Sequence, residues 1–174
     1  RDAEATAVAV RALRVIVADP APKISSGLFA QRLGPGTVVG GQLSEGGGTL
    51  AWASRVLGRA QAALERAAAG LEPDGHGLTV MPYVFGERGL GYHDSARGAV
   101  VGMTPGTDAA AIYRAMLESI AYSFAAVDGE LPSFIGRFPR TVVSGGAVAV
   151  PPPLTPVPDD PPGRDVCVQD RNQQ

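Results

Sequence analysis

Several residue types that build common functional sites are scarce in this chain. Its 174 residues include one cysteine, two histidines and a single lysine, Lys23. The lone Cys167 excludes a disulfide within the chain and fits a reducing compartment, so we expect a cytoplasmic protein. One cysteine and two histidines do not make a zinc ligand set, and we predict no metal site.

Long apolar runs and a strong charge imbalance are missing as well. No apolar stretch approaches the ~20 residues of a membrane-spanning helix, so we expect no membrane segment. The formal charge of -2 gives no electrostatic reason to expect nucleic acid or an anionic membrane as a partner. A chain of 174 residues, 45% of them hydrophobic, instead indicates one globular domain with a sizeable core.

The common phosphate-binding and nucleophile motifs are also absent. The Walker pattern GxxxxGK[ST] does not occur, and Gly86–Gly91 (GERGLG) does not match GxGxxG. His93 and Asp94 could serve acid–base chemistry, but no motif places a serine or cysteine nucleophile beside them. We expect His76 and His93 to be solvated loop residues.

Segments of strand and helix character alternate along the chain. Leu13–Ala18 is predicted to be a strand. Gly27–Leu33 and Thr37–Leu43 flank a Gly-Pro-Gly turn signal and predict a hairpin. Further strands are expected at Leu78–Phe85, where the strand should be buried, at Gly98–Met103 and at Arg140–Ser144.

Three helices are expected between these strands. The first opens at the Gly-rich Ser44–Gly48, which leaves backbone N–H groups at the positive end of the helix dipole. The second covers Gln61–Ala69 and ends at Gly70 in a C′ position. The third begins at Thr107 or Asp108 as N-cap and carries a core-facing apolar stripe: Ile112, Met116, Leu117, Ile120 and Phe124. This order of elements favours an α/β fold.

Three pieces between residues 78 and 121 carry a family resemblance. They are MPYVFGERG, ARGAVVGM and the helical AIYRAMLESIA, and the turn VSGGA follows at Val143–Ala147. Together they resemble the C-terminal domain of the FGGY carbohydrate kinases. The resemblance implies a ribonuclease H-like, actin-like α/β domain, a mixed sheet flanked by helices, over residues 1–150. The opening GGxLSxGG at residues 40–47 leans toward gluconokinases, with xylulokinases second.

The resemblance also implies a function. These two-domain enzymes transfer phosphate from ATP, with Mg²⁺, to a sugar or sugar acid, and this chain matches roughly the second domain. Gly145, Gly146 and Ala147 match the family's adenosine-binding turn, and Gly47 matches a second nucleotide-facing glycine. Glycine suits such positions because the backbone can approach a ligand without a Cβ in the way. Judged on spacing alone, the same glycines could simply form turns.

Other parts of the chain depart from the family pattern. The family's catalytic aspartate precedes a GTS phosphate loop, but this chain has Val8-Ala9-Val10 at that place, so we assign no catalytic residue. Ala111 and Val150 stand where the family has polar residues. Residues 151–174 contain a proline run that cannot continue as a helix and predicts a Pro-rich tail, either a polyproline-like linker or disordered.

Four further side chains receive structural interpretations. We expect Glu87 and Arg88 to form a structural ion pair, Glu118 to make a solvent-side or capping contact, and Trp52 to pack in the core.

Three hypotheses for the function remain open. In the first, the chain is a fragment of a kinase and binds nucleotide, and the sugar substrate is bound through a missing N-terminal domain. A homodimer is compatible with this hypothesis. Alternatively, it is a non-catalytic remnant of the same fold. In the third hypothesis it is an interaction module whose Pro-rich tail binds aromatic grooves.

Overall fold

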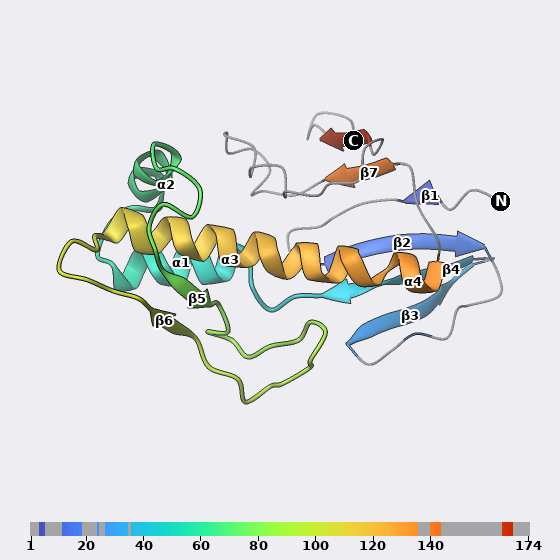
Figure 1. Ribbon diagram of the computed structural model, residues 1–174. Helices are drawn as coiled ribbons and strands as arrows, with labels where there is room; N and C mark the ends of the chain where they lie inside the picture. Colours follow the sequence, from blue (N-terminus) through green and yellow to red (C-terminus); the bar gives the residue numbers. More distant parts are fainter. Residues whose placement is uncertain are drawn as a thin grey trace.

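One long helix, α3 (Ala109–Glu130), runs along the molecule and contacts helices and strands at both of its ends (Figure 1). It belongs to a computed structural model that describes residues 4–5, 12–18, 24, 27–34, 36–135, 140–143 and 165–168. Two shorter helices, α1 (Gly47–Val56) and α2 (Gln61–Ala69), pack near its N-terminal half. A β-sheet lies along its C-terminal half, which ends in the short α4 (Pro132–Ile135).

The start of α3 is set by a side-chain cap, as the sequence predicted. The Asp108 carboxylate accepts a hydrogen bond of 2.8 Å from the backbone N–H of Ala111. Such a cap satisfies one of the four N–H groups that a helix start leaves without an intrahelical partner. Thr107 lies outside the helix and accepts the Thr104 N–H through Oγ1 at 2.9 Å. Asp108 is therefore the N-cap.

The largest sheet is antiparallel and has the strand order β1-β2-β4-β3. Its members are β1 (Glu4–Ala5), β2 (Ala12–Ala18), β3 (Leu28–Leu33) and β4 (Gly36–Gln42). The predicted hairpin is confirmed, because β3 pairs with β4 up to Leu33 opposite Gly36. Gly34 in its turn has φ 57°, a left-handed conformation that favours glycine.

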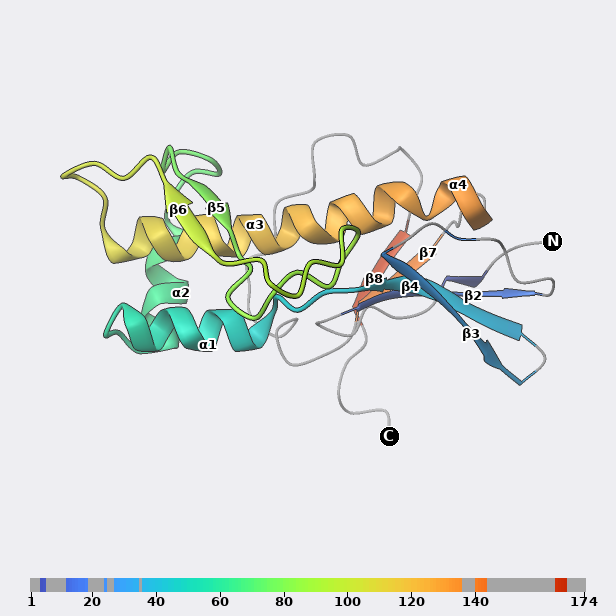
Figure 2. The same cartoon turned by 90° about the horizontal axis from the view of Figure 1, so that it is seen from below.

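Two smaller sheets complete the described strands. β7 (Arg140–Val143) pairs in parallel with β8 (Asp165–Val168), and β7 also contacts β1. β5 (Thr79–Met81) pairs antiparallel with β6 (Ala99–Val101). Helices and strands thus mix as predicted for an α/β chain, although its sheets are small. Figure 2 shows α1 and α2 toward one end, the four-stranded sheet toward the other, and α3 running between the two ends.

The prediction of a buried strand over Leu78–Phe85 was wrong in extent and burial. β5 has only three residues, and its residues Thr79 and Met81 are exposed. Opposite Thr79 on the same face lies Val101 of β6, which is 63% exposed. Only Val80, on the other face, packs against a core cluster. A two-stranded sheet with one covered face buries every second residue, so a continuous apolar run overstates its burial.

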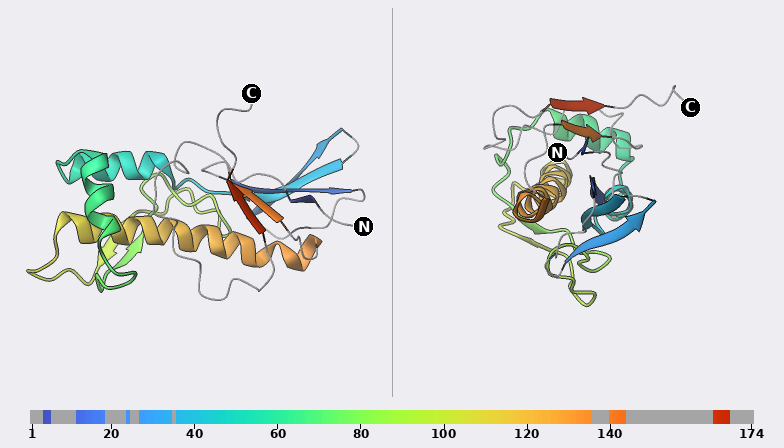
Figure 3. Two further views of the ribbon diagram at one scale, coloured as in Figure 1. Left: turned by 90° about the horizontal axis from the view of Figure 1, so that it is seen from above. Right: turned by 90° about the vertical axis from the view of Figure 1, so that its right-hand side faces the viewer.

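Two apolar clusters divide the core along α3. The first lies between α1, α2 and the N-terminal half of α3 and contains Leu50, Ala53, Leu64, Ala68, Tyr113, Met116 and Ile120. In Figure 3, α2 lies across one end of α1 and α3. The second cluster joins β4 to the C-terminal end of α3 through Val39, Leu43, Val127 and Leu131. Phe124 packs against both clusters, so α3 makes them continuous.

The predicted ends of α2 and of the chain have different outcomes. α2 ends at Ala69 as expected, but Gly70 has φ -84° and is right-handed, so a left-handed glycine does not end the helix.

Residues 144–164, with the predicted domain boundary at 150 and the proline run, lie outside the described residues. In the described part of the chain, no helix has the length and apolarity needed to cross a membrane.

We predict that the contact between Gly41 and α3 tolerates no added methyl group. A Cβ on Gly41 would lie 2.5 Å from Cγ1 of Val127, a buried residue of α3. Gly41→Ala should therefore lower the free energy of unfolding by about 1–3 kcal/mol, because an overpacked core must shift. Urea unfolding would measure this loss.

The matched control is the double variant Gly41→Ala/Val127→Ala, which removes the obstructing methyl groups. Its destabilisation should be smaller than the sum of the two single effects. Additive losses would show that the two residues do not compete for one space.

Candidate functional site

The start of α1 is a helix N-terminus without a side-chain cap. Gly46 is the N-cap, no side chain hydrogen-bonds there, and the first turn holds no acidic residue. The first intrahelical bond joins the Leu50 N–H to the Gly46 carbonyl at 3.1 Å. The N–H groups before Leu50 lie at the positive end of the helix dipole, an arrangement that suits an anionic ligand.

Gly47, the first residue of α1, has no internal reason to be glycine. A Cβ built on it would meet no heavy atom of the described residues within 4 Å, and its φ is not positive. By contrast, Gly41 is required by Val127 and Gly34 by its turn. The alternative that Gly47 merely forms a turn is therefore weakened, and its open side agrees with close approach by a ligand.

The other predicted site residues, Gly145, Gly146 and Ala147, lie outside the described residues. β7, which leads toward them, ends at Val143. Their place relative to Gly47 stays a prediction.

Polar atoms are buried without partners directly beside Gly47. Glu45 is 1% exposed and Thr49 is 0% exposed, and Oε1 of Glu45 and Oγ1 of Thr49 have no hydrogen bond. Oγ of Ser44 is buried without a partner as well. Burial raises the pKa of Glu45, and the nearby Glu87 carboxylate adds to that rise. Sequence reasoning missed this group, because a Ser-Glu pair before a Gly-rich turn is expected to be solvated.

Glu87 does not form the predicted ion pair with Arg88. Glu87 is buried and its Oε2 accepts the His93 backbone N–H at 3.2 Å, whereas the side chain of Arg88 is exposed. Among the described residues, no ion pair joins the two. One carboxylate is buried and the neighbouring guanidinium is exposed, so the two charged groups lie in different surroundings. His93 is exposed, as predicted.

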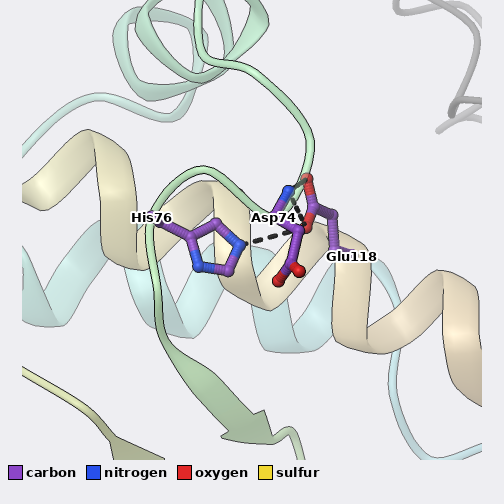
Figure 4. Close-up of side chains that lie close together, drawn as sticks. All are labelled: Asp74, His76 and Glu118. Carbon is purple, nitrogen blue, oxygen red and sulfur yellow. Dashed lines mark hydrogen bonds and ion pairs between the residues drawn. The ribbon is translucent and has the colours of Figure 1, made fainter.

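A second polar cluster ties the loop before β5 to α3 (Figure 4). The buried Glu118 of α3 accepts hydrogen bonds from His76 Nε2 at 3.0 Å and from the Asp74 backbone N–H at 3.1 Å. Arg114 Nε, one turn earlier on α3, donates to the other Glu118 oxygen. The prediction of a solvated His76 was therefore wrong. Of the two contacts expected for Glu118, solvent-side or capping, the solvent-side one was wrong, because the buried carboxylate accepts the Asp74 backbone N–H.

The histidine in this cluster is held in one tautomer. Its Nδ1 accepts the Leu78 backbone N–H at 2.9 Å, so the ring proton of a neutral His76 is on Nε2, facing Glu118. Asp74, His76 and Glu118 are close enough to hold a metal ion, but Nε2 carries a proton and both Glu118 oxygens accept hydrogen bonds. The arrangement does not fit a metal and fixes the loop instead.

Hydrogen-bond donors lower the pKa of Glu118 by more than burial raises it. Burial alone would raise the pKa of Glu118, but hydrogen bonds from Arg114, His76 and the Asp74 N–H together lower it. Position 118 could have been identified from the sequence, since it falls four residues after Arg114 on one helix. His76 could not, because its partner is 42 residues away.

Comparison with known proteins adds a family match. The model of the FGGY family of carbohydrate kinases, C-terminal domain, matches residues 14–154. A glycerol kinase from Symbiobacterium thermophilum is 49% identical over 79 residues, which are 44% of this chain and 16% of that enzyme.

Solved structures share the fold at low sequence identity. A xyloylose kinase from Brucella ovis superposes with a TM-score of 0.75 at 22% identity, over 86% of this chain and 32% of that one. Plasmodium falciparum glycerol kinase with ADP gives a TM-score of 0.69 at 19% identity, over 85% of this chain and 31% of that one. The chain spans about a third of these kinases.

We predict that Glu118→Gln destabilises the protein in a pH-dependent way. The lowered pKa means that ionised Glu118 stabilises the fold above its unfolded-state pKa of about 4.3. That stability is lost as the pH falls through the lower folded-state pKa. At about pH 7 the variant should lose about 1–3 kcal/mol of unfolding free energy. Urea unfolding of both proteins at several pH values measures this, and an equal deficit below both pKa values would contradict it.

Glu45→Gln should stabilise the protein, whereas Glu118→Gln destabilises it. The measurement uses buffer treated with a chelator, so that no metal ion can bind the Glu45 carboxylate. The raised pKa of Glu45 means that its ionisation opposes folding above the folded-state pKa, and that this cost vanishes below about pH 4.3. The variant should therefore melt at a higher temperature than the wild type near neutral pH. A lower melting temperature there would contradict the prediction.

Proposed function

Because this chain belongs to the FGGY family of carbohydrate kinases, with which its residues 14–154 align over the C-terminal domain, we propose that it is the nucleotide-binding part of an ATP-dependent carbohydrate kinase. The observation that carries this proposal is Gly47, which opens an uncapped helix and has free space where a Cβ would stand. A helix start of this kind can receive the negative charge of a nucleotide.

The proposed nucleotide site combines two stretches of the chain. Gly47 contributes from α1, and Gly145, Gly146 and Ala147 contribute from the turn after β7. ADP in the solved Plasmodium falciparum glycerol kinase supports ATP or ADP as the ligand of this family's fold. Backbone N–H groups at the α1 start would orient the nucleotide, and glycine would allow its close approach.

The proposed reaction is transfer of the γ-phosphoryl group of ATP to a hydroxyl of the carbohydrate, with Mg²⁺ neutralising charge on the phosphates. Positioning and charge stabilisation account for most catalysis of this kind. This chain would supply nucleotide binding, whereas the carboxylate base and the sugar site would lie in an N-terminal domain. On its own the chain would then bind nucleotide without turnover.

The finer assignments are proposals of the same kind. We propose a ribonuclease H-like, actin-like domain over residues 1–150, followed by a Pro-rich tail at 151–174. A sugar or sugar acid of the gluconate or xylulose type is the proposed substrate, and the cytoplasm is the proposed location. The names of similar proteins, a glycerol kinase and a xyloylose kinase, support a carbohydrate without selecting one.

A non-catalytic remnant is the second candidate. The sequence has Val8-Ala9-Val10 in place of the family's phosphate loop, and the proline run in place of a helix, and both departures favour a loss of activity. A remnant would fold cooperatively but bind no nucleotide.

We predict that the chain binds Mg-ADP and that Gly47→Val weakens binding at least tenfold. The added side chain would occupy the space through which the ligand approaches. It should leave the fold intact, because a Cβ meets no protein atom there, so unfolding free energy should change by no more than about 1 kcal/mol. Isothermal titration calorimetry measures the affinity and thermal melting the stability.

Gly129→Val is the matched control, because Gly129 is also a helical glycine without neighbours around its Cβ position. It lies near the end of α3 and should not change nucleotide affinity. Cooperative melting of the wild type without saturable binding would support the remnant and reject the proposal.

A further inference from the structure

The buried polar corner between β4 and α1 holds a carboxylate that no protein group neutralises. Glu45 is 1% exposed, its Oε1 has no hydrogen-bond partner, and the described part of the chain gives it no ion pair. An isolated buried charge is unfavourable unless it is paired or bound to a cation. The contrast is Glu118, which is also buried but accepts hydrogen bonds from three donors.

Further oxygen atoms are buried without partners in the same short stretch. Ser44 directly precedes Glu45, and Thr49 lies in the first turn of α1. Their hydroxyl oxygens are both buried and form no hydrogen bond. Glu45 directly precedes the N-cap Gly46, and Thr49 is the third residue of α1, so both lie at the start of this helix.

A second carboxylate approaches this corner from the Phe85–Gly91 segment. Oε1 of Glu87 lies 2.8 Å from the position a Cβ on Gly89 would take, and Cδ2 of Leu43 lies 3.1 Å from that same point. Leu90 also packs against the cluster that contains Leu43. Glu87 is therefore held near Leu43, two residues before Glu45. Its Oε2 accepts the His93 backbone N–H.

We propose that this corner, formed by Ser44, Glu45, Thr49 and Glu87, binds a hard divalent cation of the Mg²⁺ or Ca²⁺ class. Carboxylate and hydroxyl oxygens are the ligands that these ions take, and two carboxylates balance the charge of one divalent ion. A buried water could donate to one oxygen but would leave both negative charges in place. The ion would also join α1 to the Phe85–Gly91 segment, which are far apart in the sequence.

This inference does not depend on the proposed kinase function, since the ion would bind without nucleotide. The test uses the full chain, freed of metal with a chelator and dialysed, at constant ionic strength and without nucleotide. Thermal melting is followed during titration with magnesium chloride or calcium chloride, and calorimetry with the same salts measures binding directly. At least one of the two salts should raise the melting temperature by about 5 °C at saturation.

Glu45→Gln should lose this rise, and its affinity for the ion should fall at least tenfold. The amide keeps the shape of the side chain and removes the charge, so the variant should still fold. Glu72→Gln is the control, because Glu72 is exposed and lies in the loop after α2. It should keep the full response.

Two results would overturn the proposal. One is a wild-type protein that shows neither a cation-dependent shift nor heat of binding with either salt. The other is a shift of equal size in Glu45→Gln, which would place any bound ion elsewhere.

Discussion

Packing of α3 against both apolar clusters is the constraint on which the described structure depends. Its N-terminal half closes a cluster with α1 and α2, and its C-terminal half closes another with β4. Phe124 contacts both clusters, so neither is complete without the helix. A helix buried on several sides derives its stability from packing more than from intrinsic propensity. The position of the α1 start, and hence of Gly47, follows from this packing.

Two carboxylates, Glu118 and Glu45, are buried, and they differ in the hydrogen-bond donors around them. Glu118 has donors from its own helix and from the loop before β5, so it is ionised at little cost and fixes that loop. Glu45 has an oxygen without any donor, and burial raises its pKa. An unsatisfied buried group opposes folding unless something outside the protein satisfies it. The molecule therefore has one polar cluster whose charge is satisfied by protein donors, and one that we propose is completed by a cation.

Local signals in the sequence predicted much of the fold. The apolar stripe of α3, the Gly-Pro-Gly turn and the Asp108 cap each act within a few residues, so the hairpin and the three main helices could be placed. Side chains whose partners lie far along the chain could not. His76 meets a residue 42 positions away, and Glu87 reaches a corner built by residues near 45, so both received the wrong surroundings. The candidate site at Gly47 came from family resemblance, and the structure adds that none of the described residues requires glycine there.

The central claim is that a nucleotide binds at the start of α1, and amide chemical-shift mapping tests it most directly. The full chain labelled with ¹⁵N would be titrated with Mg-ADP, and each backbone N–H followed by nuclear magnetic resonance. The account predicts that the amides of Gly46–Thr49 and Gly145–Ala147 shift together with one affinity, while those of Asp74–Leu78 stay in place. A titration that leaves the α1 start unchanged, or that moves only amides elsewhere, would contradict it.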